Sequence, residues 1–210
     1  SAASDVYKRQ VYVETCPHYL LLEDEVYDNP DFLEAAKFVC APPIRKRTDR
    51  EALWEAMQNG EIDTVATDHC SFTTAQKRAG QYDFTKIPGG LPGVEHRGVL
   101  LYTCGVAEGR IAAPDMCRVL CENPAKLYGC WPQKGVIAPG SDADIVVYDP
   151  ETDGTISAAN QVQHVDYTPY EGMRTRGSIA QVYLRGQLAV DHGQLLAAQG
   201  RFIRRGKCGL

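Results

Sequence analysis

The chain has little that would mark a membrane protein, a nucleic-acid binder or a disulfide scaffold. No apolar stretch approaches the roughly 20 residues needed to span a bilayer, and no internal repeat or low-complexity tract occurs. Its 22 basic and 27 acidic residues are interspersed and leave a formal net charge of −5. Without a basic stripe or patch, the sequence gives no nucleic-acid footprint and no membrane-binding surface.

The eight cysteines include no Cys-x-x-Cys motif. Most of them fall within apolar or helical segments. Cys117 and Cys121 share one helix face, a spacing that metal ligands also use. Buried free thiols in a reducing cytosol are the favoured interpretation, and the expected location of the protein is cytoplasmic.

An initiator methionine is missing from the first ten residues, SAASDVYKRQ, which also lack a clear amphipathic period. We therefore interpret residues 1–10 as a non-native scar and the chain as a truncated protein. The 210 residues, 44% of them hydrophobic, are enough for one sizeable core plus a small second unit.

A short β-branched run at 62–67 ends in Asp68, and His69 and Cys70 follow it. Such a run is typical of a buried strand. In parallel barrels the catalytic groups come from the carboxyl ends of the strands. Asp68 is therefore a candidate catalytic carboxylate, with simple capping of the next segment as the open alternative.

The segments before Asp68 predict strand, helix and strand in turn. An apolar run at 11–15 reads as the first strand, and 50–58 reads as a helix that Asn59-Gly60 ends. The strand at 62–67 follows at once. This order is typical of a βα barrel.

The segment 71–93 is rich in Gly, Pro and polar residues and is expected to be a long functional loop. Further helices are predicted at 93–105, at 114–121, and in a short element capped by Asn123, begun by Pro124 and closed by Gly129.

Near residue 135 the composition changes. A turn-rich segment leads into a strand before Pro150, and two later apolar runs flank Arg185-Gly186, which is a β-hairpin signal. Residues 135–195 are therefore expected to form a second β unit, followed by a tail at 196–210.

Five segments, taken in order, resemble the C-terminal half of the dihydropyrimidinase and D-hydantoinase family, which are cyclic amidohydrolases. They are 11–20, 41–45, 50–57, 62–68 and 83–95. The resemblance runs from residue 11 to about residue 205. It implies an α/β fold in which 11–134 are the C-terminal part of a TIM-like (β/α)8 barrel and 135–195 are part of a small β-sandwich.

The resemblance also implies the chemistry. The family opens dihydropyrimidines or 5-substituted hydantoins to N-carbamoyl amino acids with two divalent metal ions, taken to be zinc. Asp68 matches the aspartate that serves as metal ligand and as acid/base. The other ligands, a His-x-His pair, a carboxylated lysine and two histidines, come from earlier strands. The 210 residues alone are therefore expected to be an inactive fragment that binds divalent metal weakly.

Other site residues carry over with departures from the family. Ala41 stands where hydantoinases carry Ser, and Gly89 where many carry Asn; both are expected to bind substrate through main-chain groups. His69 is a candidate for orienting Asp68, with a structural role as the alternative. His18 falls where the family varies and is not taken as a ligand.

Two alternatives stay open. One is an allantoinase-like or other cyclic amidohydrolase, and the other is a non-catalytic dihydropyrimidinase-related scaffold protein that has lost its metal ligands. The expected partners are a small cyclic amide or ureide and, in the full-length protein, further copies in a homotetramer. No nucleic-acid or membrane partner is expected.

Overall fold

The computed structural model describes residues 11–197 and 200–210 and shows a mixed α/β chain, which confirms the predicted class. The proposed scar at 1–10 lies outside the described residues. The strands are β1 Glu14–Thr15, β2 Thr64–Val65, β3 Ile145–Thr155, β4 Arg174–Leu184, β5 Gln187–Asp191 and β6 Gln194–Leu195. The helices are α2 Pro17–Leu21, α3 Phe32–Ala36, α4 Arg47–Gln58, α5 Thr74–Lys77, α6 Arg97–Leu101, α7 Ala113–Cys117 and α8 Asn123–Leu127.

Strands β1 and β2 are parallel neighbours, with Glu14 opposite Thr64 and Thr15 opposite Val65. Both strands are shorter than the predicted strands at 11–15 and 62–67. At their start the amides of Asp63 and Thr64 both donate to the carbonyl of Val13, at 2.8 and 3.2 Å. Because both amides bind the same Val13 oxygen, regular pairing begins only at Glu14 and Thr64.

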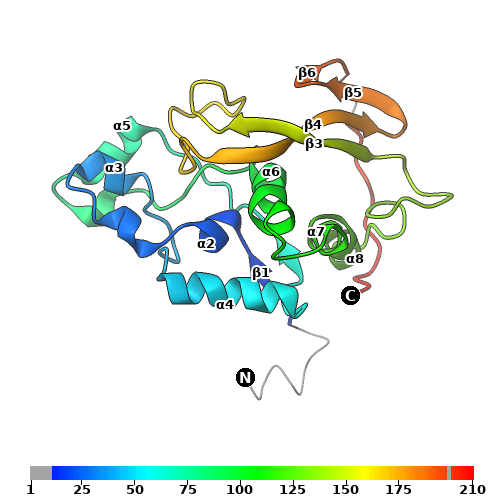
Figure 1. Ribbon diagram of the computed structural model, residues 1–210, viewed down its shortest axis with the longest axis horizontal. Coiled ribbons are helices and arrows are strands. Elements are labelled where there is room, and N and C mark those ends of the chain that lie inside the picture. The colour runs from blue at the N-terminus through cyan, green and yellow to red at the C-terminus, as the bar shows by residue number, and fades with distance from the viewer. Residues whose placement is uncertain (1–10, 198–199) are drawn as a thin grey trace.

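Helix α4 packs the parallel pair into the main core. It covers the predicted 50–58 and begins earlier, at Arg47. Trp54 and Met57 are buried with Leu20 and Val65, and the Trp54 indole N–H donates to the Leu20 carbonyl at 2.8 Å. In Figure 1, α4 lies on the opposite side of the molecule from the β3–β6 sheet.

The helices at 97–107 and 113–127 differ from their predicted form. The first starts at Arg97, not at 93, and runs from α6 directly into a π-helix at Tyr102–Ala107. The second runs without a break from α7 through a π-helix at Arg118–Glu122 into α8. Asn123 is therefore not an N-cap, since its backbone is helical and its side-chain amide donates to the Asp63 carbonyl at 2.9 Å.

The prediction of a loop throughout 71–93 is wrong. It contains α5 and two short 3-10 turns, Arg78–Gly80 and Phe84–Lys86. The Thr73 hydroxyl accepts from the Gln76 amide at 3.2 Å, and the Gln76 side chain accepts from the Thr73 amide at 2.7 Å. This reciprocal capping starts α5 despite its polar composition.

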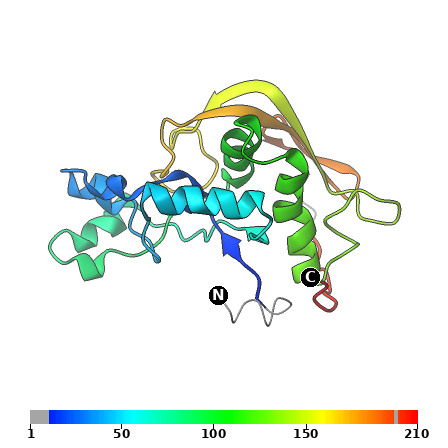
Figure 2. The same ribbon diagram turned by 60° about the horizontal axis from the view of Figure 1, so that its bottom comes forward.

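Strands β3 to β6 form an antiparallel sheet in sequence order. The predicted hairpin is confirmed: Leu184 pairs with Gln187, and Arg185 and Gly186 have φ of 51° and 78°. Figure 2 shows β3 and β4 as a curved ribbon arching over α6. The division at residue 135 stays a prediction.

The connection between β3 and β4 contacts the segment that follows β2. The Asp166 carboxylate accepts from the Thr74 amide at 2.9 Å, and the Glu95 carboxylate accepts from the amides of Val162 and Gln163 at 2.7 and 2.9 Å. Tyr170, on the same connection, is buried against Leu100. The segment 156–173 thereby ties the sheet to the loops that follow β2.

All eight cysteines are free, as predicted. The expectation that they are buried holds for Cys16 alone: Cys40, Cys104 and Cys130 are half-buried, and Cys70, Cys117, Cys121 and Cys208 are exposed. Across the described residues, no helix combines the length and the apolar content that a membrane crossing needs.

Candidate functional site

The strand ends of β1 and β2 bring together the residues that the sequence singles out. The carboxyl ends of parallel strands meet at one edge of a sheet. Asp68 follows β2 closely and is exposed, and His18 and Tyr19 follow β1. Asp68 has φ of 45°, in the left-handed region. Few residue types other than glycine, asparagine and aspartate adopt it readily, so the backbone at this strand end suits an aspartate.

The Asp68 charge acts on the groups at the end of β1. Burial raises the pKa of Cys16 to about 12, and Asp68 adds to that shift. Burial likewise raises the pKa of Tyr19, with contributions from Cys40 and Asp68. Burial lowers the pKa of His18 from 6.5 to about 4, and Asp68 partly opposes that change. At neutral pH the exposed carboxylate therefore faces a neutral imidazole, a neutral thiol and a neutral phenol.

The buried imidazole predicts a loss of stability in acid. Unfolded His18 binds a proton below pH 6.5, whereas the folded side chain resists protonation until about pH 4. Its contribution is present above pH 6.5 and is lost as the pH falls towards 4. We expect the free energy of unfolding to drop by about 3 kcal/mol through this group.

The measurement is urea unfolding with EDTA present, at pH 7 and pH 4.5, of the longest natural polypeptide that contains this chain. His18→Gln should flatten the pH dependence. His192→Gln is the matched control, because the His192 side chain is 78% exposed. If His18→Gln keeps the pH dependence of the wild type, His18 is not the titrating group.

His69 is held by hydrogen bonds to the glycine-rich segment at 89–94. Its Nδ1 accepts from the amides of Gly93 and Val94 at 3.1 and 3.2 Å. His69 also pairs with Leu91 in a parallel bridge, next to a bond from the Cys70 amide to the Leu91 carbonyl at 3.1 Å. These contacts give the imidazole a structural role. Orientation of Asp68 by His69 stays a prediction.

The two predicted substrate-binding residues lie side by side. A Cβ placed on Gly89 would be 3.9 Å from the Cα of Cys40 and 4.0 Å from the backbone nitrogen of Ala41. Ala41 and Gly89 are both exposed, whereas Gly90 is buried. The Gly90 amide donates to the Val39 carbonyl at 3.0 Å, so the two loops are joined by their backbones.

Lys77 is a residue of this site that the sequence did not reveal. Its side chain is fully buried, and its ammonium donates to the carbonyls of Val39, Pro88 and Gly90. A lysine in the polar run Thr-Ala-Gln-Lys reads as solvent-exposed. The carbonyls it binds lie on segments distant in sequence, so no local pattern could have identified it.

The described residues do not make a complete metal site. No group of three or more His, Cys, Asp or Glu side chains suited to an ion occurs within 11–197 and 200–210. The exposed Asp68 carboxylate fits one ligand of a site shared with other residues. It does not fit a site formed by this chain alone.

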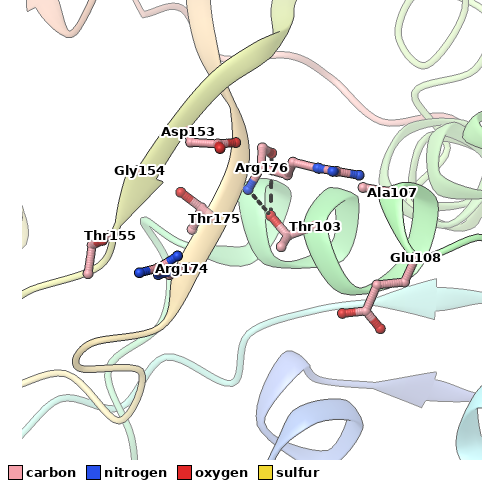
Figure 3. A pocket seen from close by; sticks show the side chains of 9 residues that line it. All are labelled: Thr103, Ala107, Glu108, Asp153, Gly154, Thr155, Arg174, Thr175 and Arg176. Atoms are coloured by element: carbon pink, nitrogen blue, oxygen red, sulfur yellow. Dashed lines mark hydrogen bonds between the residues drawn. The ribbon is translucent and has the colours of Figure 1, made fainter.

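A cavity of about 540 Å³ lies elsewhere, between the π-helix at Tyr102–Ala107 and strands β3 and β4. Figure 3 shows Arg174, Arg176 and Asp153 around it, with Thr103 bonded to the backbone of Arg176. None of the residues placed at the strand ends lines this cavity. The cavity is therefore separate from the candidate site at the ends of β1 and β2.

Known proteins similar to this chain come from one family. The model of the "Amidohydrolase family" matches residues 15–189. D-phenylhydantoinase from Escherichia coli O127:H6 is 42% identical over 198 residues, 93% of this chain and 42% of that protein.

Two solved structures are also similar. The dihydropyrimidinase from Brevibacillus agri NCHU1002 has a TM-score of 0.88 and 43% identity, over 93% of this chain and 42% of that one. The D-hydantoinase (dihydropyrimidinase) from Thermus sp. has a TM-score of 0.89 and 41% identity, over 94% and 43%. The chain thus spans less than half the length of these relatives. It belongs to the amidohydrolase family.

Proposed function

We propose that this chain is the C-terminal part of a metal-dependent cyclic amidohydrolase that opens dihydropyrimidines or 5-substituted hydantoins to N-carbamoyl amino acids. The observation that carries the proposal is the exposed, left-handed Asp68 at the end of β2, inside the family match at 15–189. The names of the relatives, D-phenylhydantoinase and dihydropyrimidinase, supply the substrate class.

Asp68 would serve as one metal ligand and as the proton carrier. When bound, divalent metal, taken to be zinc, supplies Lewis-acid polarisation and a more acidic water. An Asp68 carboxylate oxygen accepts the proton of the attacking water and delivers it to the ring nitrogen as the amide bond breaks. The carboxylate suits this task because its neighbours His18, Cys16 and Tyr19 are neutral at pH 7. None of the three forms an ion pair with the carboxylate that would compete with a metal ion.

The backbones at Ala41 and Gly89 would hold the ring. Both residues are small and exposed, and the two loops touch, so we expect their peptide N–H and C=O groups to be accessible to a cyclic amide. A main-chain contact survives the departures from Ser and Asn. The departures are expected to alter selectivity more than affinity.

The same proposal covers the architecture. Strands β1 and β2 would be the last two strands of a TIM-like barrel at 11–134, and β3 to β6 would belong to a small β-sandwich at 135–195. The remaining metal ligands would come from residues outside this chain. We propose a cytoplasmic homotetramer for the whole enzyme.

The test is a ring-opening assay at pH 7 with hydantoin, dihydrouracil and allantoin. The longest natural polypeptide that contains this chain, loaded with zinc, should open hydantoin or dihydrouracil. The 210 residues alone should show no turnover and no stoichiometric tight zinc, since one aspartate cannot provide three or four ligands. Preference for allantoin would favour the allantoinase-like alternative, and a folded protein without metal or turnover would favour the scaffold.

A further inference from the structure

Lys77 is a buried cation that has no acidic partner among the residues that the structure describes. Its side chain is 0% exposed, and no carboxylate within the described ranges forms an ion pair with it. Burying an unpaired ammonium is strongly unfavourable unless its donors are satisfied. The fold therefore supplies compensation at this position.

Three backbone carbonyls provide that compensation. The Nζ atom lies 2.8 Å from the Val39 oxygen, 2.8 Å from the Pro88 oxygen and 2.9 Å from the Gly90 oxygen. An ammonium has three N–H donors, so each one is used. The Phe72 ring, 5.7 Å from Nζ, adds a cation–π contact.

The acceptors belong to the two loops that touch at the candidate site. Val39 directly precedes Cys40 and Ala41, and Pro88 and Gly90 flank Gly89. One side chain on α5 thus bonds to both loops, while Ala41 and Gly89 stay exposed. Arginine, with a planar guanidinium, does not match three converging acceptors in this way.

The charge of Lys77 strengthens the link at neutral pH. Burial lowers the pKa of Lys77 to about 8, and Cys40 and Cys70 partly oppose that change. The side chain is therefore mainly an ammonium at pH 7. Hydrogen bonds from a charged donor are about twice as strong as neutral ones.

We propose that Lys77 is a positioning residue that holds the loops carrying Ala41 and Gly89 in register, so that their backbones form the cradle for the cyclic amide. This inference rests on the proposed function, because it needs a ring bound by these loops. It assigns Lys77 to substrate binding and leaves proton transfer to Asp68.

The experiment compares Lys77→Met with Lys86→Met in the longest natural polypeptide that contains this chain, loaded with zinc. Lys86 lies in the same segment, but its side chain is 69% exposed. At pH 7, Lys77→Met should raise KM for hydantoin at least about tenfold and change kcat less than about threefold. This is the signature of lost uniform binding. The zinc content of Lys77→Met should match that of the wild type. The kinetics of Lys86→Met should also match the wild type.

Hydrogen exchange gives a second readout that does not need turnover. In Lys77→Met, the amides at 39–41, 89–91 and 93 should exchange at least about tenfold faster, and those of β1, β2 and α4 should stay protected. Lys86→Met should leave both loops unchanged. If the wild type opens no ring, the proposed function fails, while this exchange pattern still decides whether Lys77 positions the loops.

Three outcomes would overturn the inference. The first is KM within about twofold of the wild type in folded Lys77→Met, and the second is unchanged exchange of both loops. Lys77→Gln keeps two N–H donors and should give intermediate changes if Lys77→Met does not fold. The third outcome is that neither Lys77 variant folds while Lys86→Met does. Lys77 is then a general folding determinant, and the positioning role is wrong.

Discussion

Asp68→Asn should lower kcat for ring opening at least about 10³-fold in the longest natural polypeptide that contains this chain. Acid–base transfer alone contributes roughly 10²–10⁴, and the same carboxylate is the proposed metal ligand. Asparagine is the informative substitution because Asp68 has φ of 45°, a conformation that asparagine also tolerates. Alanine would add backbone strain and confuse the two effects.

The measurement combines steady-state kinetics with zinc analysis and a thermal melt. The matched control is Asp28→Asn, which removes an exposed carboxylate at the end of the turn Asp24–Tyr27. It should keep normal kcat and zinc content. Near-normal turnover of Asp68→Asn with the melt unchanged would return Asp68 to the structural role of a capping residue.

The strand that precedes Asp68 could be predicted from sequence because its signals are local, whereas the catalytic role of Asp68 stays a prediction. The run 62–67 is short and β-branched, and a polar residue closes it, so strand and strand end are both read from adjacent residues. The helix 50–58 and the hairpin at Arg185-Gly186 are confirmed for the same reason. The position of each depends on its immediate neighbours.

Other features were missed because distant residues determine them. Asn123 has the composition of a cap, yet its amide donates to the Asp63 carbonyl and the helix runs through it. Lys77 would ordinarily be solvated, but carbonyls at positions 39, 88 and 90 replace water around it. Tertiary contacts override local preference in both cases.

The contact between the loops at Ala41 and Gly89 depends on Gly90 in a similar way. The sequence identified a Gly-Gly pair but could not show which glycine is required. Gly90 has φ of 154°, and a Cβ there would lie 2.4 Å from the Cys70 oxygen and 2.7 Å from the Cys70 Cβ. On Gly89 the nearest atom would be 3.9 Å away, an ordinary contact. The requirement therefore falls on Gly90.

Gly90→Ala should lower the free energy of unfolding by about 4 kcal/mol in the same polypeptide, by urea titration at pH 7. Backbone strain at this φ contributes about 1–3 kcal/mol, and overpacking against Cys70 contributes about 1–3 kcal/mol. Gly60→Ala separates the two effects, because Gly60 has φ of 73° with no atom within 4 Å of the added Cβ. It should cost about 1 kcal/mol, and Gly89→Ala should stay within about 0.5 kcal/mol of the wild type. If Gly90→Ala lowers the free energy of unfolding no more than Gly60→Ala does, the added Cβ is accommodated beside Cys70 without cost. The close contact between the end of β2 and the glycine-rich loop then does not determine where Gly89 lies.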